Sequence, residues 1–198
     1  MPAPRSTEAT SRLRADLLGH ARTLVRRDGP SALTMRALAQ EADCAVGLPY
    51  KVFADREEIV IELIKLELDD LVAQFDEWLA GSEQHSVSAN LDRYATILLD
   101  SPAAALVHAE LMGARVVDDR LAAATRDSAF IASLHTAVPE YLRLEQRRGR
   151  VRTDVDAEAF GFLITGAIHN LIAAGSVYPR PSRAELSAIL EHIAQTIT

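Results

Sequence analysis

The sequence contains a single cysteine, Cys44, among its 198 residues. One cysteine excludes an internal disulfide framework and a cysteine-based zinc site. Aromatic residues are scarce, at 5% of the chain, and this scarcity favours helices over a β-sandwich. The chain lacks a long uninterrupted apolar run, so we expect no membrane span, and residues 1–6 lack the apolar core of a signal peptide. These absences predict a soluble, cytoplasmic, mostly helical protein.

Charge is distributed unevenly along the chain, although its net value of −7 argues against a protein that coats nucleic acid over its whole surface. Residues 1–56, which we call the head, contain nine Lys and Arg against six Asp and Glu. Residues 57–198, the body, contain twelve against twenty-two. A basic head on an acidic body is expected of a module that meets phosphate at one end. Chance explains the offset equally well, so it carries weight only together with a docking motif.

Apolar residues recur at helical spacing in the first third of the chain. They predict a helix over about residues 9–28, a shorter one capped by Thr34, and a third short helix over about residues 45–52. A capping box at Asp55 opens a long helix that ends near Leu79.

The rest of the sequence brings the predicted total to about nine helices. Ser101 and Ser182 are placed to cap two of them. Pro139 lies inside a third, where we expect a kink or a local break. The predicted ranges are about 91–98, 102–113, 118–148, 155–174 and 182–197.

The last two predicted helices differ in character. The helix over residues 155–174 has little polar face, so it must be covered on both sides, whereas the helix over 182–197 has a single apolar stripe. Ordinary packing within one chain explains both patterns, but they are also typical of a two-fold helix-bundle interface. We predict a homodimer whose interface residues are Phe160, Ile164, Ile168, Leu171, Leu186, Ile189, Leu190 and Ile193.

Three short helices with a tight break between the second and third fit a helix-turn-helix, whose third helix enters the DNA major groove. The residues that make this pattern specific are Thr34, the Leu38-Ala39 pair, Gly47, the Tyr50-x-x-Phe53 motif and the Arg56-Glu57-Glu58-Ile59 start of the fourth helix. Over about residues 11–71 the chain resembles the tetracycline-repressor (TetR) family of transcriptional regulators.

The resemblance implies an all-α protein with two domains. A TetR-type DNA-binding domain covers residues 11–71, with its helix-turn-helix at about 34–53, and a ligand-binding and dimerisation domain covers residues 72–198. The implied function is a transcriptional repressor that binds a palindromic double-stranded DNA operator as a dimer. A small-molecule effector then releases it from the operator.

Side chains of the head have the chemistry that DNA contact requires. Gly47 leaves room for close approach of the backbone, and Tyr50 and Lys51 offer donors to phosphate oxygens. Arg36 reaches either a phosphate or a guanine edge. The predicted DNA-binding residues are Thr34, Arg36, Val46, Gly47, Leu48, Tyr50, Lys51 and Arg56. Because Val46, Gly47 and Leu48 lack bidentate donors, we expect contacts to thymine methyl groups and extensive recognition of DNA shape.

The sequence departs from the family pattern between the second and third helices. Asp43, Cys44 and Ala45 stand where the family typically has Gly, an aliphatic residue and Ser or Thr. Ala45 cannot cap the third helix, and Pro49 lies within it. Since Pro49 removes only the first intrahelical bond, we expect this helix to survive with a distorted start.

The body offers polar and aromatic side chains that would suit a mostly apolar ligand with an anionic or carbonyl end. For each of them, core packing is the competing interpretation. The candidates are Trp78, Tyr94, His108, Met112, Arg115, Phe130, His135, Tyr141, His169 and Asn170.

Motifs for enzyme chemistry are missing from the sequence. It contains no glycine-rich phosphate loop, His-Glu-x-x-His or Gly-x-Ser-x-Gly motif. We therefore expect no catalytic residues, metal or cofactor. Two alternatives to a DNA-binding regulator stay open: a helical sensor or carrier whose head binds protein, and a helical-bundle enzyme. A redox role for Cys44 also stays open.

Overall fold

The computed structural model describes residues 4–106, 128–173 and 180–198. Every regular element in these ranges is helical, which confirms the all-α prediction. The α-helices are α1 (Pro4–Asp28), α2 (Met35–Glu41), α3 (Arg56–Ala80), α4 (Val87–Leu99), α7 (Ala129–Arg147), α8 (Ala157–Ala173) and α9 (Arg183–Ile197), and the short 3₁₀ turns are η1 (Pro30–Ala32), η2 (Pro49–Lys51) and η3 (Ser82–Gln84). Among the described residues, no helix combines the length and apolar character that crossing a bilayer requires.

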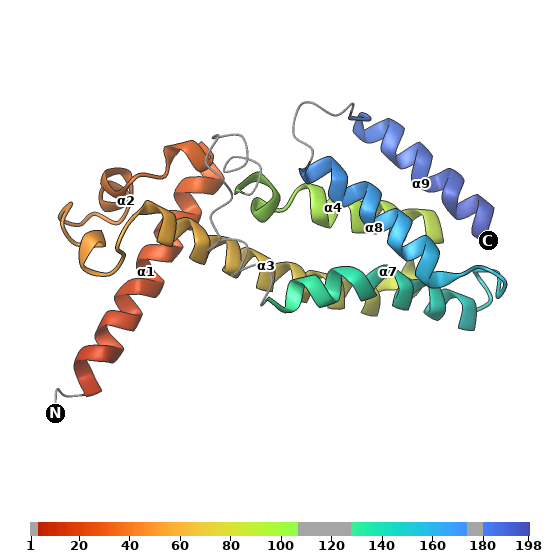
Figure 1. The fold of residues 1–198 in the computed structure, drawn as a ribbon, viewed down its shortest axis with the longest axis horizontal. Coiled ribbons are helices and arrows are strands. Elements are labelled where there is room, and N and C mark those ends of the chain that lie inside the picture. The colour runs from red at the N-terminus through yellow and green to blue at the C-terminus, as the bar shows by residue number, and fades with distance from the viewer. Residues whose placement is uncertain (1–3, 107–127, 174–179) are drawn as a thin grey trace.

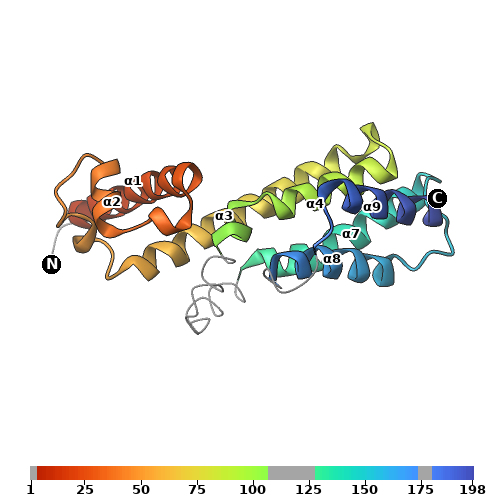
Figure 2. The same cartoon turned by 90° about the horizontal axis from the view of Figure 1, so that it is seen from above.

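The molecule is elongated, with α1 and α2 at one end (Figure 1). The long helix α3 starts beside them and extends to the other end, where α4, α7, α8 and α9 gather (Figure 2). Helix α3 packs against α1 on the head side and against α4 and α7 in the body, while α8 packs on α7 and α9 on α4. Helix α3 therefore connects the head to the body.

Local capping bonds fix where several helices begin, as the sequence predicts. The Thr34 hydroxyl accepts a hydrogen bond from the Ala37 amide at 3.0 Å. Asp55 accepts from the Glu58 amide at 2.7 Å. Ser182 and Glu185 form the predicted reciprocal capping box at the start of α9. These oxygens satisfy amides that have no partner within the first helical turn.

Aromatic side chains form the centre of the body. Trp78 of α3 packs against Tyr94 and Tyr141, with ring centroids 5.2 and 4.8 Å apart, respectively. Phe75, one turn earlier, lies between Tyr94 and Phe130. All five side chains are buried. The scarce aromatic residues are thus concentrated where α3, α4 and α7 meet.

Helix α7 continues through Pro139, so of the two expected outcomes, a kink or a local break, the break does not occur. Proline removes one intrahelical hydrogen bond, but here its ring is buried against α8. A Cβ atom placed on Gly161 of α8 would lie 2.5 Å from two ring carbons of Pro139. The Pro139 ring thus packs into a notch that the absence of a side chain at Gly161 leaves on α8.

Replacing Gly161 by alanine is therefore expected to destabilise the protein by about 1–3 kcal/mol, because the rigid proline ring cannot move aside. The matched control is Gly166→Ala on the same helix, where an added Cβ meets nothing within 4 Å. That control should be neutral or stabilising, since alanine is a better helix former than glycine. Urea denaturation measures both, and equal stability of the two variants would contradict the notch.

Candidate nucleic-acid interface

The turn that follows α2 orients the segment predicted to meet DNA. The Cys44 amide donates to the Ala39 carbonyl at 2.9 Å, and the Asp43 amide to the Gln40 carbonyl at 3.2 Å. This pair of bonds is the Schellman motif that ends many helices. It places Asp43 in the left-handed region, with φ of +46°. Cys44, half-buried against the core, occupies the position where this motif usually makes an apolar contact.

The left-handed backbone explains why glycine suits position 43. Replacing Asp43 by glycine is expected to raise the free energy of unfolding by up to about 1 kcal/mol, because glycine adopts this conformation without steric strain. Asp43→Asn is the control, since it removes the charge but keeps a side chain that tolerates left-handed backbone. Urea denaturation distinguishes the two. A gain in the asparagine variant alone would assign the effect to charge instead.

The segment after this turn is not the α-helix that the sequence predicts. Residues 45–52 form turns and the short 3₁₀ element η2. Pro49 has no amide hydrogen to donate to the Ala45 carbonyl, which accepts from the Leu48 amide at 2.8 Å instead. Ala45 also has no side-chain oxygen to cap a first turn. Because the segment lacks both a side-chain cap and its first α-helical hydrogen bond, it forms turns and a 3₁₀ element in place of an α-helix.

This recognition segment, Gly47–Lys51, lies mainly on the surface. Tyr50 is 58% exposed, and Val46, Gly47 and Lys51 are exposed beside it. Leu48 is half-buried. A Cβ atom on Gly47 would meet nothing within 4 Å, so the free protein imposes no need for glycine at this position.

Helix α2 adds two of the predicted residues, whereas Arg56 is engaged inside the protein. Thr34 and Arg36 are exposed at the start of α2. The Arg56 guanidinium donates to the Leu33 carbonyl at 2.8 Å and to the Pro30 carbonyl at 3.4 Å. It therefore ties the start of α3 to the residues before α2. Phosphate contact by Arg56 stays a prediction.

Carboxylates neutralise much of the basic excess of the head. Arg22 and Arg26 of α1 pair with Glu67 of α3, whose side chain is buried. Arg27 pairs with Asp28 and Glu41. These interactions raise the pKa of Arg22 and Arg27, chiefly through hydrogen bonds from the guanidinium groups to Glu67 and Asp28, respectively.

Two cations of the head have no such partner in the part of the chain that the structure describes. Arg36 and Lys51 form no ion pair there, and both are exposed. Counting charges along the sequence does not distinguish cations that pair within the protein from cations that are available to DNA. The acidic residues of α3, several of which pair with arginines of α1, are the sequence feature that could have made this distinction. Among the described side chains, Arg36 of α2 and Lys51 of the recognition segment are therefore available to phosphate.

The aromatic candidates for ligand binding belong to the core of the body. Trp78 donates its indole hydrogen to the Asn90 carbonyl at 2.9 Å. The Tyr94 hydroxyl bonds the Thr165 hydroxyl at 3.1 Å, and burial raises the pKa of Tyr94 to about 12. Phe130 and Tyr141 are buried with them between the helices, and a role for these four side chains in ligand binding stays a prediction.

Two of the predicted ligand residues do line a cavity. His135 of α7 and His169 of α8 border a volume of about 410 Å³, within the range of small-molecule sites. The remaining lining residues are Ile131, Leu134, Glu158, Gly161, Phe162, Thr165 and Gly166. Asn170 is exposed. His108, Met112 and Arg115 lie outside the described residues.

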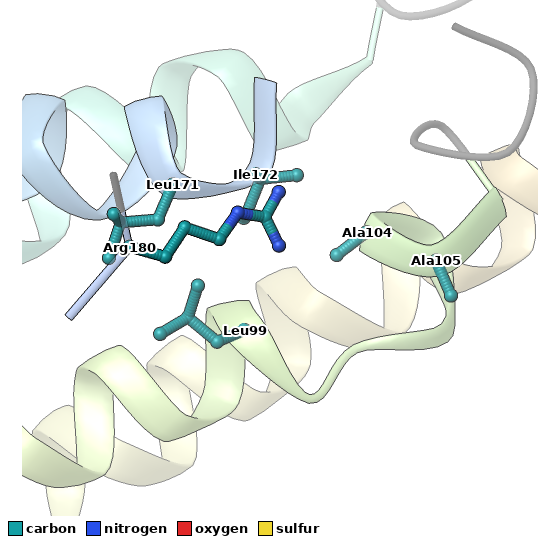
Figure 3. A pocket seen from close by; sticks show the side chains of 6 residues that line it. All are labelled: Leu99, Ala104, Ala105, Leu171, Ile172 and Arg180. Atoms are coloured by element: carbon teal, nitrogen blue, oxygen red, sulfur yellow. The ribbon is translucent and has the colours of Figure 1, made fainter. Parts of the chain in front are cut away.

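A smaller pocket, of about 160 Å³, lies between α4 and α8. Figure 3 shows the Arg180 side chain reaching between Leu99 of α4 and Leu171 and Ile172 of α8, with Ala104 and Ala105 on the far side. The lining is apolar apart from the guanidinium. This volume is below that of most ligand sites.

The predicted dimer residues divide between the core and the surface. Ile164, Ile168, Leu186 and Leu190 are buried within one chain, so they contribute to its own core, and their place in an interface stays a prediction. Phe160, Leu171 and Ile193 are half-buried, and Ile189 is exposed. The prediction missed Phe162 and Leu163 of α8, which are 72% and 63% exposed.

Comparison with known proteins shows what the chain is similar to. No family model matches the chain. The transcriptional repressor KstR2 of Rhodococcus jostii is 28% identical over 170 residues, which cover 82% of this chain and 79% of that protein.

Solved structures share the fold over nearly the whole chain. A TetR-family regulator from Mesorhizobium loti has a TM-score of 0.63 and 19% identity, covering 94% of this chain and 95% of its own. A TetR/AcrR-family regulator from Thermobifida fusca has a TM-score of 0.60 and 14% identity, covering 91% and 95%. FadR of Bacillus subtilis, solved with stearoyl-CoA, has a TM-score of 0.56 and 16% identity, covering 92% and 96%. The chain therefore has the TetR fold.

Proposed function

We propose that this chain is a transcriptional repressor of the TetR type, which binds a palindromic DNA operator as a homodimer and is released by a small molecule. Residues 11–71 form the DNA-binding domain and residues 72–198 the ligand-binding and dimerisation domain. The observation that carries the proposal is the exposed recognition segment, where Lys51, which has no ion pair among the described residues, lies beside Tyr50 and an unobstructed Gly47. Such a regulator acts in the cytoplasm, where the DNA is.

Binding to duplex DNA at increasing salt tests the proposal. The probe is a duplex selected from a random-sequence pool by the purified chain, with a scrambled duplex as control. Affinity should fall steeply and linearly on a logarithmic salt scale, because each phosphate contact releases counterions. A head that binds protein, the alternative function, gives no affinity for either duplex.

Gly47→Ala is the sharpest variant for this assay. An added methyl group meets nothing in the free protein, so the variant should fold with unchanged or slightly higher stability. If the backbone at Gly47 lies against DNA, operator affinity falls by about tenfold or more through steric exclusion. Wild-type affinity in this variant would argue against close backbone approach.

We infer that the exposed face of α8 is the homodimer interface. Phe162 and Leu163 project from α8, and Ile189 projects from α9. In a two-fold interface the same patch is used by both chains. Phe162→Glu should shift the protein from dimer to monomer in sedimentation, because it would bury a charge at the contact. The control is Gln74→Glu, which adds a charge at an exposed position of α3 and should leave the dimer intact.

The cavity between α7 and α8 is our candidate for the effector site. Its volume suits a small molecule, and His135 and His169 offer hydrogen bonds at its border. Gly166→Leu should fill it, since nothing lies within 4 Å of an added Cβ. Native mass spectrometry of protein purified from cells should find a bound molecule in the wild type and not in this variant. Equal occupancy would place the effector elsewhere.

A further inference from the structure

The guanidinium of Arg14, on α1, joins three parts of the protein. Its Nε donates to both carboxylate oxygens of Glu62 at 3.0 and 3.1 Å. Its Nη2 donates to Glu58 at 2.5 Å, and its Nη1 to the Val52 carbonyl at 2.5 Å. The guanidinium carbon also lies 4.5 Å from the centre of the Phe53 ring. One side chain thus connects α1, α3 and the residues that directly follow the recognition segment.

This connection matters because the recognition segment has little regular structure of its own. Its internal bonds are those of short turns, such as the Lys51 amide to the Leu48 carbonyl at 3.0 Å. A long α-helix would fix the direction of its side chains through a continuous ladder of bonds. Here the direction in which Tyr50 and Lys51 project depends on where the ends of the segment are held.

The Arg14 side chain is suited to fix one end of the recognition segment. Its side chain is 28% exposed, and the two facing carboxylates have similar exposure. The guanidinium of Arg14 is charged at any physiological pH, and the hydrogen bond to Glu62 raises its pKa further. Planar guanidinium also suits simultaneous bonds to a carboxylate, a carbonyl and an aromatic face, an arrangement that an ammonium group cannot reproduce.

We propose that Arg14 is a positioning residue for DNA binding, which holds the Val52 end of the recognition segment so that Tyr50 and Lys51 face the duplex. Arg14 itself does not contact DNA. This proposal rests on the proposed DNA-binding function, but its central claim concerns the free protein and is measurable there.

The first measurement is amide hydrogen exchange in the full chain without DNA. In Arg14→Ala the amides of Lys51, Val52 and Phe53 should exchange about tenfold faster or more, because the segment opens locally. Arg14→Lys should exchange almost as fast, since one ammonium cannot replace all the contacts. The control is Arg12→Ala on the same helix, whose ion pair with Glu8 is exposed. Wild-type exchange in both Arg14 variants would overturn the proposal.

The second measurement is affinity for the selected duplex, at a temperature where circular dichroism shows each variant fully folded. Arg14→Ala and Arg14→Lys should both bind about tenfold more weakly or worse, and Arg12→Ala as tightly as the wild type. Rescue by lysine would show that the charge alone matters, and would overturn the positioning role. Unchanged exchange with weakened binding would make Arg14 a direct contact. If the wild type binds no DNA, the proposed function fails, while the exchange data still decide whether Arg14 holds the segment.

Discussion

Replacing Trp78 by alanine is expected to lower the free energy of unfolding by about 3–5 kcal/mol, the range for removing a fully buried aromatic side chain. Trp78 is 1% exposed and packs against Tyr94 and Tyr141. The indole N–H of Trp78 donates a hydrogen bond to the Asn90 carbonyl. The alanine variant therefore also leaves a buried acceptor with one partner fewer. Urea denaturation followed by circular dichroism measures the loss.

Trp78→Phe separates the two contributions. Phenylalanine keeps most of the apolar contact but cannot donate to Asn90, so it should lose about 1–3 kcal/mol. If Trp78 lined a ligand site instead of the core, the alanine variant would keep its stability and lose only effector binding. That outcome would contradict the aromatic core described above.

The sequence was most informative where structure depends on residues close together in the chain. The caps at Thr34, Asp55 and Ser182 were predictable because a side-chain oxygen and its amide partner lie three residues apart. The break after α2 is also predictable from residues close together in the chain, although the positive φ of Asp43 is not. Local chemistry therefore located most helix starts within the described chain.

Prediction failed where two neighbouring effects had to be combined. The absent cap at Ala45 and the proline at position 49 were each recognised, and each alone leaves a helix intact. Together they remove both the side-chain bond and the first backbone bond of the segment. The sequence analysis considers the missing cap and the missing amide hydrogen one at a time, whereas the conformation of the segment depends on both together.

Apolar periodicity also cannot show what covers a helix. Ile164 and Phe162 both belong to the apolar pattern of α8, yet one is buried in its own chain and the other is exposed. Likewise, the sequence makes Trp78 and His135 equal candidates for a ligand site, yet Trp78 is buried among core side chains and His135 borders a cavity. These distinctions depend on contacts between distant segments, such as α7 with α8.

Replacing Tyr50 and Lys51 together by alanine is expected to weaken operator binding by about 100-fold or more, since each donor lost to a phosphate is worth about tenfold or more. Both side chains are exposed in the free protein, so stability should change little. Lys51→Ala alone should weaken binding equally for operator and scrambled duplexes, and reduce the salt slope by about 0.9 per chain. Fluorescence anisotropy across a salt series measures both quantities.

Arg36→Ala distinguishes a contact to a base from the phosphate contact expected of Lys51. If Arg36 reads a base edge, its loss weakens the operator more than the scrambled duplex and relaxes preference at one position in each half-site. Lys65→Ala, the loss of an exposed cation on α3, controls for net charge and should have little effect. Equal losses from Lys51→Ala and Lys65→Ala would mean that the recognition segment has no special role, because the duplex would then respond only to overall charge.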